Sequence, residues 1–460
     1  MVGRLAREHN VKCFCYDRSL VNRLVLDIMK THRYVRQVEG NELSERETHP
    51  VLAVMSELDI GPAHIDVGRL AVNYYDKNHG EGLTLEEYVR EQLDYLIGNH
   101  EKPVERPRDI VLYGFGRIGR LVARILIDKT DGGEAMRQRA VVVRKGNAAN
   151  DIVKRASLLR RDSVHGAFEG TIRVDEDRQM FVANGNEIQV IYADSPDSID
   201  YTAYGIQDAI IIDNTGVWRD EEGLSRHLQS KGVDKVILTA PGKGALKNIV
   251  AGINQDEIAE GDRIISAASC TTNAIVPPLK AIDDEFGIVH GHVETVHAYT
   301  NDQNLIDNYH KADRRGRAAP LNMVITETGA AKAVAKVLPQ LEGKLTGNAI
   351  RVPTPNVSMA ILNLTLGRES SKDELNEYMR KMALHSNMRR QIDYSNSPEV
   401  VSSDFVGSRA ACVYDAQATI VNGSQAVVYL WYDNEFGYSC QVMRILERIA
   451  GINYQVYPPQ

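Results

Sequence analysis

Short apolar runs without polar alternation recur between residues 108 and 270. Four of them are Ala140–Val143, Asp208–Gly216, Asp234–Pro241 and Asp262–Ser269, and helical patterns such as EEGLSRHLQSKG lie between some of them. Continuous apolar runs separated by helices are typical of parallel strands that are covered on both faces. This part of the chain is therefore predicted to form an open, doubly wound α/β sheet of the Rossmann type.

The pattern changes after residue 270, where the apolar runs become longer. They are GIVHGHVETVHAYT (Gly287–Thr300), VSMAILNLTLG (Val357–Gly367) and SQAVVYLWYDNEFGYS (Ser424–Ser439). Runs of this kind indicate antiparallel strands and a second, α+β domain. The final segment, CQVMRILERIAGINYQV, has the periodicity of an amphipathic helix and is expected to pack on the first sheet.

The first hundred residues are dominated by helical patterns. Thr84 and Glu87 form a capping box before the apolar stripe of Leu85, Val89, Leu93 and Leu96, and Gly98 stands at a C′ position. The stretch VNRLVLDIMKTHRYVRQV is also helix-like, and GNHEKPVERPRD reads as a linker. The predicted organisation is a mostly helical extension over 1–108, a doubly wound domain over 109–269, an α+β domain over 270–440 and a returning helix over 441–460.

Composition and charge exclude several classes of protein. The chain has 460 residues, a formal net charge of −8, and no apolar run near the roughly 18 residues of a membrane span. Nucleic acid and membrane are therefore not expected as partners. The first twenty residues lack the apolar core of a secretory signal. Five cysteines, an odd number, favour a reducing cytoplasm, and the lone pair Cys13 and Cys15 offers too few ligands for a metal site.

A glycine-rich turn, YGFGRIGR, follows the first predicted strand of the α/β domain. Gly114, Gly116 and Gly119 have the spacing G-x-G-x-x-G, and the sequence after them is predicted to open a helix. Such glycines permit a tight turn and let the backbone approach a dinucleotide pyrophosphate at the helix N-terminus. A tight turn without a ligand is the alternative, and the strand–turn–helix context disfavours it.

Cys270, in SAASCTTNAI, and His297, in VHAYT, are the candidate catalytic residues. The cysteine stands where a strand ends and a helix can begin, and a helix N-terminus lowers the pKa of a thiol. A Cys–His pair is the arrangement that activates a thiol and moves a proton. A buried structural cysteine and an ordinary histidine are the alternatives, but the polar neighbours Ser269, Thr271, Thr272 and Asn273 disfavour the first.

Anion-binding side chains are scattered downstream of the cysteine. They are Arg314, Arg315 and Arg317, then Thr328 and Gly329 in TETGAAKAVAK, and Arg351 in NAIRVPTPN. Arginines suit bidentate phosphate binding, and hydroxyls with free backbone N–H groups complete such sites. Each of these elements by itself is equally consistent with a solvated loop.

In chain order, YGFGRIGR, SAASCTTNAI, VHAYT, TGAAKAVAKVLPQLEGKLTG, IRVPTPNVS and WYDNEFGYS resemble the glyceraldehyde-3-phosphate dehydrogenase family. The resemblance covers about three-quarters of the chain, from Ile110 to the C-terminus. It implies NAD(P)-dependent oxidation and phosphorylation of glyceraldehyde 3-phosphate through a thioester on Cys270, with His297 as base. It also implies that His297 as imidazolium holds Cys270 as thiolate.

The resemblance assigns further site residues. For the cofactor they are Gly114, Gly116, Arg117, Ile118, Gly119, Thr215, Gly216, Asn434, which fixes the nicotinamide amide, and Tyr438, its packing partner. For the substrate phosphate they are Thr300 and Arg351, and for the attacking inorganic phosphate Ser269, Thr271, Arg315, Thr328 and Gly329.

Several positions depart from the family pattern. Where the family ends its second strand in Asn-Asp, this chain has Arg144 and Lys145. Loss of the ribose-binding carboxylate removes repulsion of a 2′-phosphate, so NADP is predicted to be accepted and is a candidate for the preferred cofactor, with NAD still usable. The alternative is that both side chains point to solvent. Other departures are Ala267 for Asn, Ala274 for Cys, Glu327 beside an anion site, and the inserted DGGEAMRQR.

Alternatives remain open at this point. An erythrose 4-phosphate dehydrogenase would use the same thiol and hydride chemistry. A non-catalytic regulator could use the extension as an interaction module, and the extension could instead cap the cofactor site or control assembly. By analogy with the family, a cytoplasmic homotetramer is expected.

Overall fold

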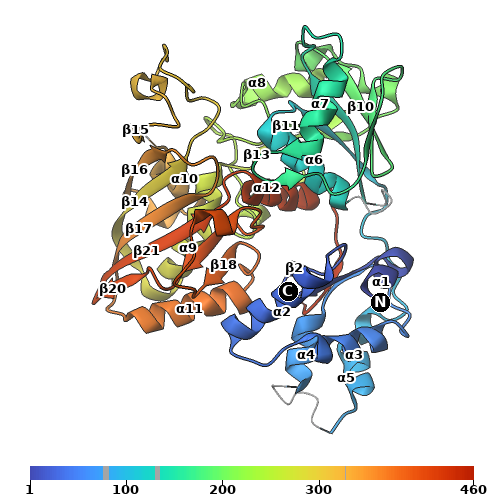
Figure 1. Cartoon of the computed structure of the whole chain (residues 1–460), viewed down its shortest axis with the longest axis vertical. Helices are drawn as coiled ribbons and strands as arrows, with labels where there is room; N and C mark the ends of the chain where they lie inside the picture. Colours follow the sequence, from blue (N-terminus) through green and yellow to red (C-terminus); the bar gives the residue numbers. More distant parts are fainter. Residues whose placement is uncertain (76–81, 130–134, 327, 460) are drawn as a thin grey trace. The chain divides into compact units, whose positions relative to one another are not determined.

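The computed structural model describes residues 1–75, 82–129, 135–326 and 328–459. Contacts between residues divide the chain into two compact units (Figure 1). The N-terminal unit consists of Met1–Glu105 together with Gly451–Gln460, and the larger unit is Arg106–Ala450. Among the described helices, none is long and apolar enough to cross a membrane.

The N-terminal unit contains the expected helices and, in addition, a small sheet. The capping box at Thr84 forms, with Glu87 accepting from the Thr84 backbone at 2.8 Å. The sheet has the order β2-β1-β3-β22. Its strands are short, so the sequence of this region predicts mainly helices. The elements are α1 (Val2–His9), β1 (Val11–Cys15), β2 (Arg18–Ser19), α2 (Val25–Glu39), α3 (Glu45–Met55), β3 (Ala63–Asp66), α4 (Val67–Tyr75) and α5 (Leu85–Gln92).

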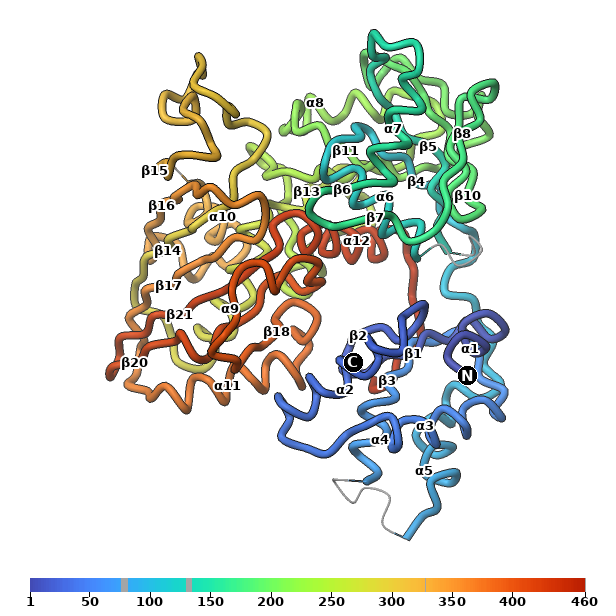
Figure 2. Tube along the Cα trace, viewed as in Figure 1, coloured from blue at the N-terminus to red at the C-terminus, as the bar shows by residue number. Residues whose placement is uncertain are grey.

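The last strand of that sheet comes from the other end of the chain. β22 (Gln455–Tyr457) pairs in parallel with β3, and the Tyr95 hydroxyl donates to the Val456 carbonyl at 2.6 Å. Figure 2 shows the red C-terminal segment beside the blue strands. The prediction of a helix through to residue 460 is therefore wrong beyond Ile449. Gly451, with φ +70°, takes the left-handed conformation that ends helices, and the segment after it finds backbone partners in β3.

An eight-stranded sheet forms the first half of the larger unit, with the order β13-β12-β11-β4-β5-β10-β9-β8. Its strands from β13 to β10 are parallel, as the continuous apolar runs predict, and β4 and β11 are buried almost throughout. The strands are β4 (Arg108–Tyr113), β5 (Met136–Val143), β8 (Ile172–Asp175), β9 (Met180–Ala183), β10 (Asn186–Tyr192), β11 (Ala209–Asp213), β12 (Val233–Leu238) and β13 (Ile264–Ser266). The helices are α6 (Arg117–Lys129), α7 (Asp151–Arg160) and α8 (Glu221–Ser225), and β6 (Arg161–Asp162) pairs with β7 (Gly166–Ala167).

The chain order reverses at β4, which lies between β5 and β11. In open α/β sheets, ligands bind beyond the carboxyl ends of the strands at such a switch point. The turn that contains Gly114 follows β4 directly, so the topology places the glycine motif at the expected binding edge.

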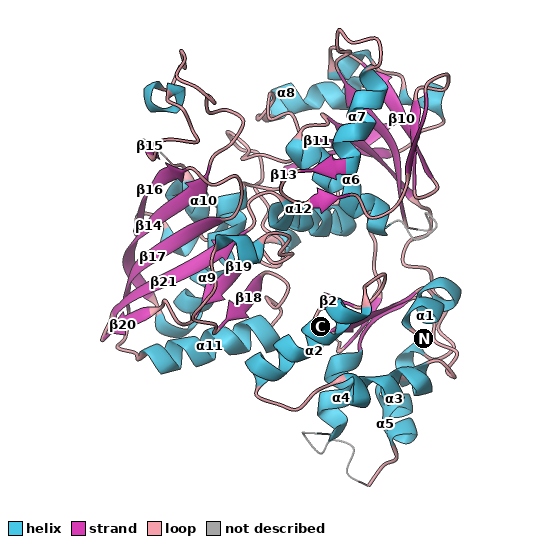
Figure 3. Ribbon diagram, viewed as in Figure 1, coloured by secondary structure: helices cyan, strands magenta, loops and turns pink. Residues whose placement is uncertain are grey.

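A mixed sheet with the order β15-β16-β14-β17-β21-β19-β18 forms the second half, and β20 pairs with β21. Burial alternates along β17 and β21, because only one face of the sheet is covered. Figure 3 shows helices α9, α10 and α11 with this sheet. The strands are β14 (Ile288–Ala298), β15 (Val324–Thr326), β16 (Leu345–Val352), β17 (Ser358–Leu366), β18 (Ile392–Ser395), β19 (Cys412–Asp415), β20 (Ile420–Asn422) and β21 (Gln425–Tyr432). The helices are α9 (Cys270–Phe286), α10 (Ala330–Val337), α11 (Lys372–His385) and α12 (Phe436–Ile449).

Helix α12 leaves the second sheet and packs along α6 of the first. The chain between β21 and α12 therefore runs from the second sheet to the first. Asn434 lies in that connection, and Tyr438 lies in the first turn of α12. This connection therefore joins the two halves of the larger unit.

Candidate active site

The glycine turn between β4 and α6 has the geometry of a dinucleotide site. Gly114 has φ +90°, and a Cβ there would lie 2.9 Å from the Thr215 Cγ2. A Cβ on Gly119 would lie 2.4 Å from the Gly114 carbonyl oxygen, so this glycine allows close packing of helix on strand. A Cβ on Gly116 would meet nothing within 4 Å, which leaves space where a pyrophosphate can approach the backbone. The residues present thus fit a dinucleotide.

Arg117 and Ile118 are the first two residues of α6, where backbone N–H groups are free for an anion. Nearby, the backbone N–H and hydroxyl of Thr215 both donate to Asp213 Oδ1, at 2.7 and 2.6 Å, and Gly216 follows with φ +62°. Asp213 also meets the buried His227 at 3.0 Å. Sequence reasoning missed Asp213 and His227, although the first stands two residues before Thr215.

Arg144 and Lys145 follow the end of β5 and are both exposed. The Lys145 ammonium lies 5.7 Å from the centre of the Tyr192 ring. A carboxylate that the sequence did not indicate, Asp151, begins α7 directly after this loop and accepts from Arg155 at 2.7 Å. Burial opposes its charge, but hydrogen bonds from Arg155, Tyr192 and the backbone lower its pKa. The loop thus ends at a carboxylate that is paired with an arginine of the same helix.

Cys270 is the first residue of α9, and the loop before it is tightly braced. Ser269 is the N-cap, and its hydroxyl accepts from the Thr272 backbone N–H at 3.0 Å. The Asn273 amide donates to the carbonyls of Ala267 and Ser269, each at 2.9 Å. The polar neighbours of Cys270 therefore support the loop that presents the thiol. The Thr271 hydroxyl lies 3.1 Å from the Tyr432 hydroxyl.

His297, near the end of β14, faces this thiol. Its Nε2 lies 3.6 Å from the Cys270 Sγ, and its Nδ1 lies 2.7 Å from the Ala298 carbonyl oxygen. If Nδ1–H donates to that carbonyl, Nε2 carries the lone pair that can accept the thiol proton. The Arg351 Nη1, which can only donate, lies 2.8 Å from Nδ1 and 3.2 Å from the same Ala298 oxygen, and in this tautomer its hydrogen bond goes to the oxygen. An imidazolium beside this guanidinium would be repelled, which favours the neutral ring.

The electrostatics of the pair differ from the expected thiolate–imidazolium ion pair. Burial raises the pKa of the Cys270 thiol, although Arg351 opposes the rise. Burial, and then Arg351, lower the pKa of His297 to about 3. For Cys270, the effect of burial on the pKa therefore outweighs the opposing effects of the helix N-terminus and of Arg351. Both the thiol and the imidazole are neutral in the free protein. The expectation of a ground-state ion pair is corrected accordingly.

Thr300, Arg315 and Arg351 come together around one carboxylate, Asp302. The Thr300 hydroxyl and the Arg315 guanidinium both donate to it. Burial opposes ionisation of Asp302, but Thr300, Arg315 and Arg351 lower its pKa. The Arg351 Nε is buried and has no hydrogen-bond partner among the described residues. Two arginines thus lie close to the thiol, and the Arg351 Nε–H is available for an anion. Asp302 was missed, although it stands two residues after Thr300.

Thr328 and Gly329 stand at the start of α10, where Gly329 is the N-cap. The Thr328 hydroxyl accepts from the Ala330 N–H at 3.2 Å, and the Gly329 carbonyl accepts from the Ala333 N–H at 2.8 Å. Within the part of the chain that the structure describes, these bonds tie the two residues to their own helix. Glu327, and the first residues of the inserted DGGEAMRQR, lie outside the described residues.

Asn434 and Tyr438 are both tied to the backbone around the catalytic pair. Asn434 Oδ1 accepts from the Ser358 hydroxyl at 2.8 Å, and the same hydroxyl accepts from the Ala298 N–H at 3.0 Å. The Tyr438 hydroxyl donates to the Ala268 carbonyl at 2.9 Å. Ser358, which sequence reasoning missed, therefore fixes the Asn434 amide and leaves its NH₂ group as the donor.

Comparison with known proteins agrees with these features. The family model described as "Glyceraldehyde 3-phosphate dehydrogenase, NAD binding domain" matches residues 108–221, and the one described as "Glyceraldehyde 3-phosphate dehydrogenase, C-terminal domain" matches residues 269–434. A "Glyceraldehyde-3-phosphate dehydrogenase-like protein" of Pseudomonas aeruginosa is 60% identical over 460 residues, which are 100% of this chain and 99% of the relative.

Shorter relatives match as well. "Glyceraldehyde-3-phosphate dehydrogenase 2" of Bacillus subtilis is 40% identical over 74% of this chain and 96% of its own length. "Glyceraldehyde-3-phosphate dehydrogenase A, chloroplastic" of Zea mays is 38% identical over 77% of this chain and 85% of its own length. With both domain models matched in order, the chain belongs to the glyceraldehyde-3-phosphate dehydrogenase family.

Proposed function

We propose that this protein oxidises and phosphorylates glyceraldehyde 3-phosphate to 1,3-bisphosphoglycerate with NAD(P) as hydride acceptor. The observation that carries the proposal is the 3.6 Å approach of His297 Nε2 to the Cys270 thiol beside the Arg351 guanidinium. A thiol, a base and cationic side chains in one place are what covalent oxidation of a phosphorylated aldehyde requires.

The first half of the reaction follows from the geometry of the pair. The Cys270 sulfur bonds to the aldehyde carbon as His297 Nε2 takes the thiol proton, and the ring returns this proton to the carbonyl oxygen. When hydride later leaves that carbon, Nε2 removes the hydroxyl proton, and a thioester remains on Cys270. Since burial keeps His297 unprotonated in the free protein, the ring is ready to accept the thiol proton, and after returning it the ring is ready to accept the hydroxyl proton. The cofactor, when bound, supplies the hydride acceptor.

The second half needs inorganic phosphate. A phosphate oxygen attacks the acyl carbon, the carbon–sulfur bond breaks, and the departing sulfur regains a proton from His297. The guanidinium of Arg315, which lies with Arg351 around Asp302, supports a phosphate close to this carbon. We propose Thr300 and Arg351 for the substrate phosphate, and Ser269, Thr271, Arg315, Thr328 and Gly329 for the attacking phosphate.

The proposed cofactor site uses the glycine turn, the residues at the start of α6, Thr215 and Gly216, together with Asn434 and Tyr438. The turn and the helix N-terminus suit the pyrophosphate. The Asn434 NH₂ group, oriented by Ser358, suits a carboxamide oxygen.

Phosphate dependence is the direct test of the reaction. With saturating aldehyde and cofactor, we expect the steady-state rate to fall by about tenfold or more when phosphate is omitted, because only slow hydrolysis then releases the thioester. The measurement is NAD(P)H absorbance with glyceraldehyde 3-phosphate, repeated with erythrose 4-phosphate. Equal turnover with and without phosphate would refute the phosphorylating reaction, and a higher kcat/KM for the four-carbon sugar would favour that substrate instead.

We also propose that NADP is accepted as cofactor and is a candidate for the preferred one, with NAD still usable. Arg144 and Lys145 are exposed at the end of β5, where a 2′-phosphate would lie in a Rossmann site, and Arg155 neutralises the nearby Asp151. A kcat/KM for NADP far below that for NAD would refute this proposal.

Replacement of Lys145 by aspartate tests the assignment. Lys145→Asp exchanges a cation for a carboxylate, so we expect the NADP-to-NAD ratio of kcat/KM to fall roughly 10- to 100-fold, the size of a lost charge-assisted hydrogen bond. Lys154→Asp is the matched control, because Lys154 is also exposed and lies on the following helix, α7. An unchanged ratio in Lys145→Asp would show that this side chain does not meet the cofactor.

We propose a cytoplasmic homotetramer by analogy with the family. Large apolar side chains are exposed on either side of residues 313–316, and they are Leu305, Ile306, Tyr309, Leu321 and Met323. Exposed patches of this kind support burial in an assembly. Five cysteines without disulfides support a reducing compartment.

A further inference from the structure

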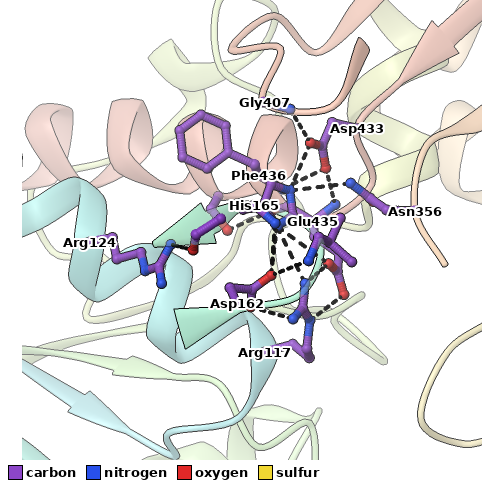
Figure 4. Close-up of polar contacts among 12 residues, drawn as sticks. Arg117, Arg124, Asp162, His165, Asn356, Gly407, Asp433, Glu435 and Phe436 are labelled. Carbon is purple, nitrogen blue, oxygen red and sulfur yellow. Dashed lines mark hydrogen bonds and ion pairs between the residues drawn. The ribbon is translucent and has the colours of Figure 1, made fainter. Parts of the chain in front are cut away.

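A cluster of charged side chains joins the glycine turn to the connection between β21 and α12 (Figure 4). One side of the cluster is Arg117, at the start of α6, with Asp162 and His165 of the β6–β7 hairpin. The other side is Asp433 and Glu435, which flank Asn434 in the chain. The established steps of thiol chemistry use none of these charges.

Arg117 and Glu435 form the first bridge. The guanidinium donates through Nε to Glu435 Oε1 at 2.9 Å and through Nη2 to Glu435 Oε2, while Nη1 donates to Asp162. A bidentate arginine–carboxylate pair fixes both position and orientation. Arg117 directly follows Gly116, so Glu435 is tied to the turn proposed to meet the pyrophosphate.

His165 and Asp433 form the second bridge. His165 Nε2 lies 3.0 Å from Asp433 Oδ2, and the Asn356 amide lies 3.2 Å from the same ring nitrogen. Asp433 Oδ2 also accepts from the Gly407 N–H at 2.8 Å. Its other oxygen, Oδ1, accepts the backbone N–H groups of Glu435 at 3.0 Å and Phe436 at 2.8 Å. This carboxylate therefore holds the chain on the C-terminal side of Asn434.

The His165–Asp433 bridge and Asp162 are enclosed by protein, and both of these aspartates have a lowered pKa. The side chains of Asp162 and His165 are each 5% exposed, and that of Asp433 is fully buried. Burial opposes the charge of Asp162, but backbone N–H groups and Arg117 lower its pKa to about 2. The Asp433 pKa is also lowered against burial, first by His165. Removing one member of such a pair leaves a buried charge uncompensated, so the cluster holds one geometry firmly.

Asn434 is consequently held from three directions. Ser358 orients its amide from the second sheet, and its two neighbours, Asp433 and Glu435, are paired with His165 and Arg117 in the first half of the unit. We propose that Asp433 and Glu435 are positioning residues that couple the pyrophosphate-binding turn to the nicotinamide-binding Asn434. This inference rests on the proposed function, because it takes the cofactor roles of the turn and of Asn434 from there. Binding at one end of the dinucleotide then favours binding at the other.

The test compares two ligands on one variant. Glu435→Gln keeps the size of the side chain and removes the charge that pairs with Arg117. By calorimetry, we expect it to weaken binding of the whole dinucleotide about tenfold, while the fragment without nicotinamide binds as in the wild type. The ligands are NADH and ADP-ribose, or NADPH and its 2′-phosphorylated fragment, whichever dinucleotide the wild type binds more tightly. In kinetics, the KM for cofactor should rise more than kcat falls.

A matched control separates positioning from general destabilisation. Glu447 pairs with Lys129 at 2.5 Å and also links α12 to α6. Glu447→Gln should leave both affinities unchanged. The inference would be overturned if Glu435→Gln lost as much affinity for the fragment as for the whole dinucleotide. It would also be overturned if Glu435→Gln and Glu447→Gln lost affinity for the dinucleotide equally.

Two further measurements keep the inference testable if Glu435→Gln folds poorly. His165→Ala should weaken dinucleotide binding, and His165→Gln, whose amide can still donate to Asp433, should restore it. In a double-mutant cycle, Glu435→Gln and Asn434→Ala should be non-additive for dinucleotide affinity, and additivity would overturn the coupling. Calorimetry measures binding and needs no turnover. If the wild type bound the cofactor but did not oxidise glyceraldehyde 3-phosphate, the proposed reaction would be refuted. The binding comparisons would still decide whether the two sites are coupled.

Discussion

Cys270→Ala should abolish oxidation of glyceraldehyde 3-phosphate, with a loss in kcat on the order of 10⁵- to 10⁶-fold, as for removal of the nucleophile from other covalent enzymes. The thioester cannot form without the sulfur, and the side chains around it offer no second thiol, because Cys412 and Cys440 are buried. Steady-state turnover and trapping of the acyl-enzyme by mass spectrometry measure the effect.

Cys412→Ala is the control for this loss. Cys412 lies in β19 and is fully buried, so its replacement removes the same atom without touching the proposed chemistry. It should retain wild-type kcat, and Cys270→Ala should retain wild-type affinity for the dinucleotide. Substantial phosphorylating activity in Cys270→Ala would refute the covalent mechanism.

His297→Asn should lower kcat by roughly 10²- to 10⁴-fold, the usual contribution of a general base, with a smaller change in KM for the aldehyde. The loss arises because Nε2, 3.6 Å from the sulfur, is the atom that accepts the proton. His292→Asn is the matched control. His292 lies five residues earlier on β14, so its side chain points to the opposite face, where it meets Thr346.

The pH profile distinguishes this role from a structural one. Because the pKa of His297 is lowered to about 3, the wild type should show no loss of kcat/KM from imidazole protonation between about pH 5 and pH 8. In His297→Asn, attack depends on thiolate formed without the base, and the thiol pKa is raised. In this variant, log kcat/KM plotted against pH should rise with a slope near one up to the ordinary thiol pKa of about 8.5 and beyond it. If kcat/KM of the wild type fell on the acid side with an apparent pKa of about 6.5, the assignment of a neutral Cys270–His297 pair would be contradicted.

The catalytic pair and the glycine turn were predictable because each depends on local chain geometry. A strand followed by G-x-G-x-x-G and a helix forms one kind of turn, and a cysteine after a strand end opens a helix with its thiol at the N-terminus. Their charge states were not predictable. Desolvation depends on every atom packed around Cys270 and His297, and it reverses what the helix end alone would do.

Supporting residues were missed for a related reason. Asp302, Ser358 and Glu435 are ordinary polar residues in the sequence, and each acquires a role only from a partner distant in the chain. Glu435 pairs with Arg117, which is 318 residues earlier in the chain, and a contact of this kind cannot be predicted from local periodicity.

By itself, the sequence of this protein determined the parallel sheet, the strand-rich second half, the helices of the extension and the positions of the thiol and its base. These follow from apolar periodicity and short motifs, which act over a few residues. Only the tertiary structure decided that the C-terminal segment becomes strand β22 beside β3, that Cys270 and His297 are neutral, and that charges on α6 and beside Asn434 pair. Backbone pairing, desolvation and ion pairing join residues far apart in the chain, so the folded chain alone specifies them.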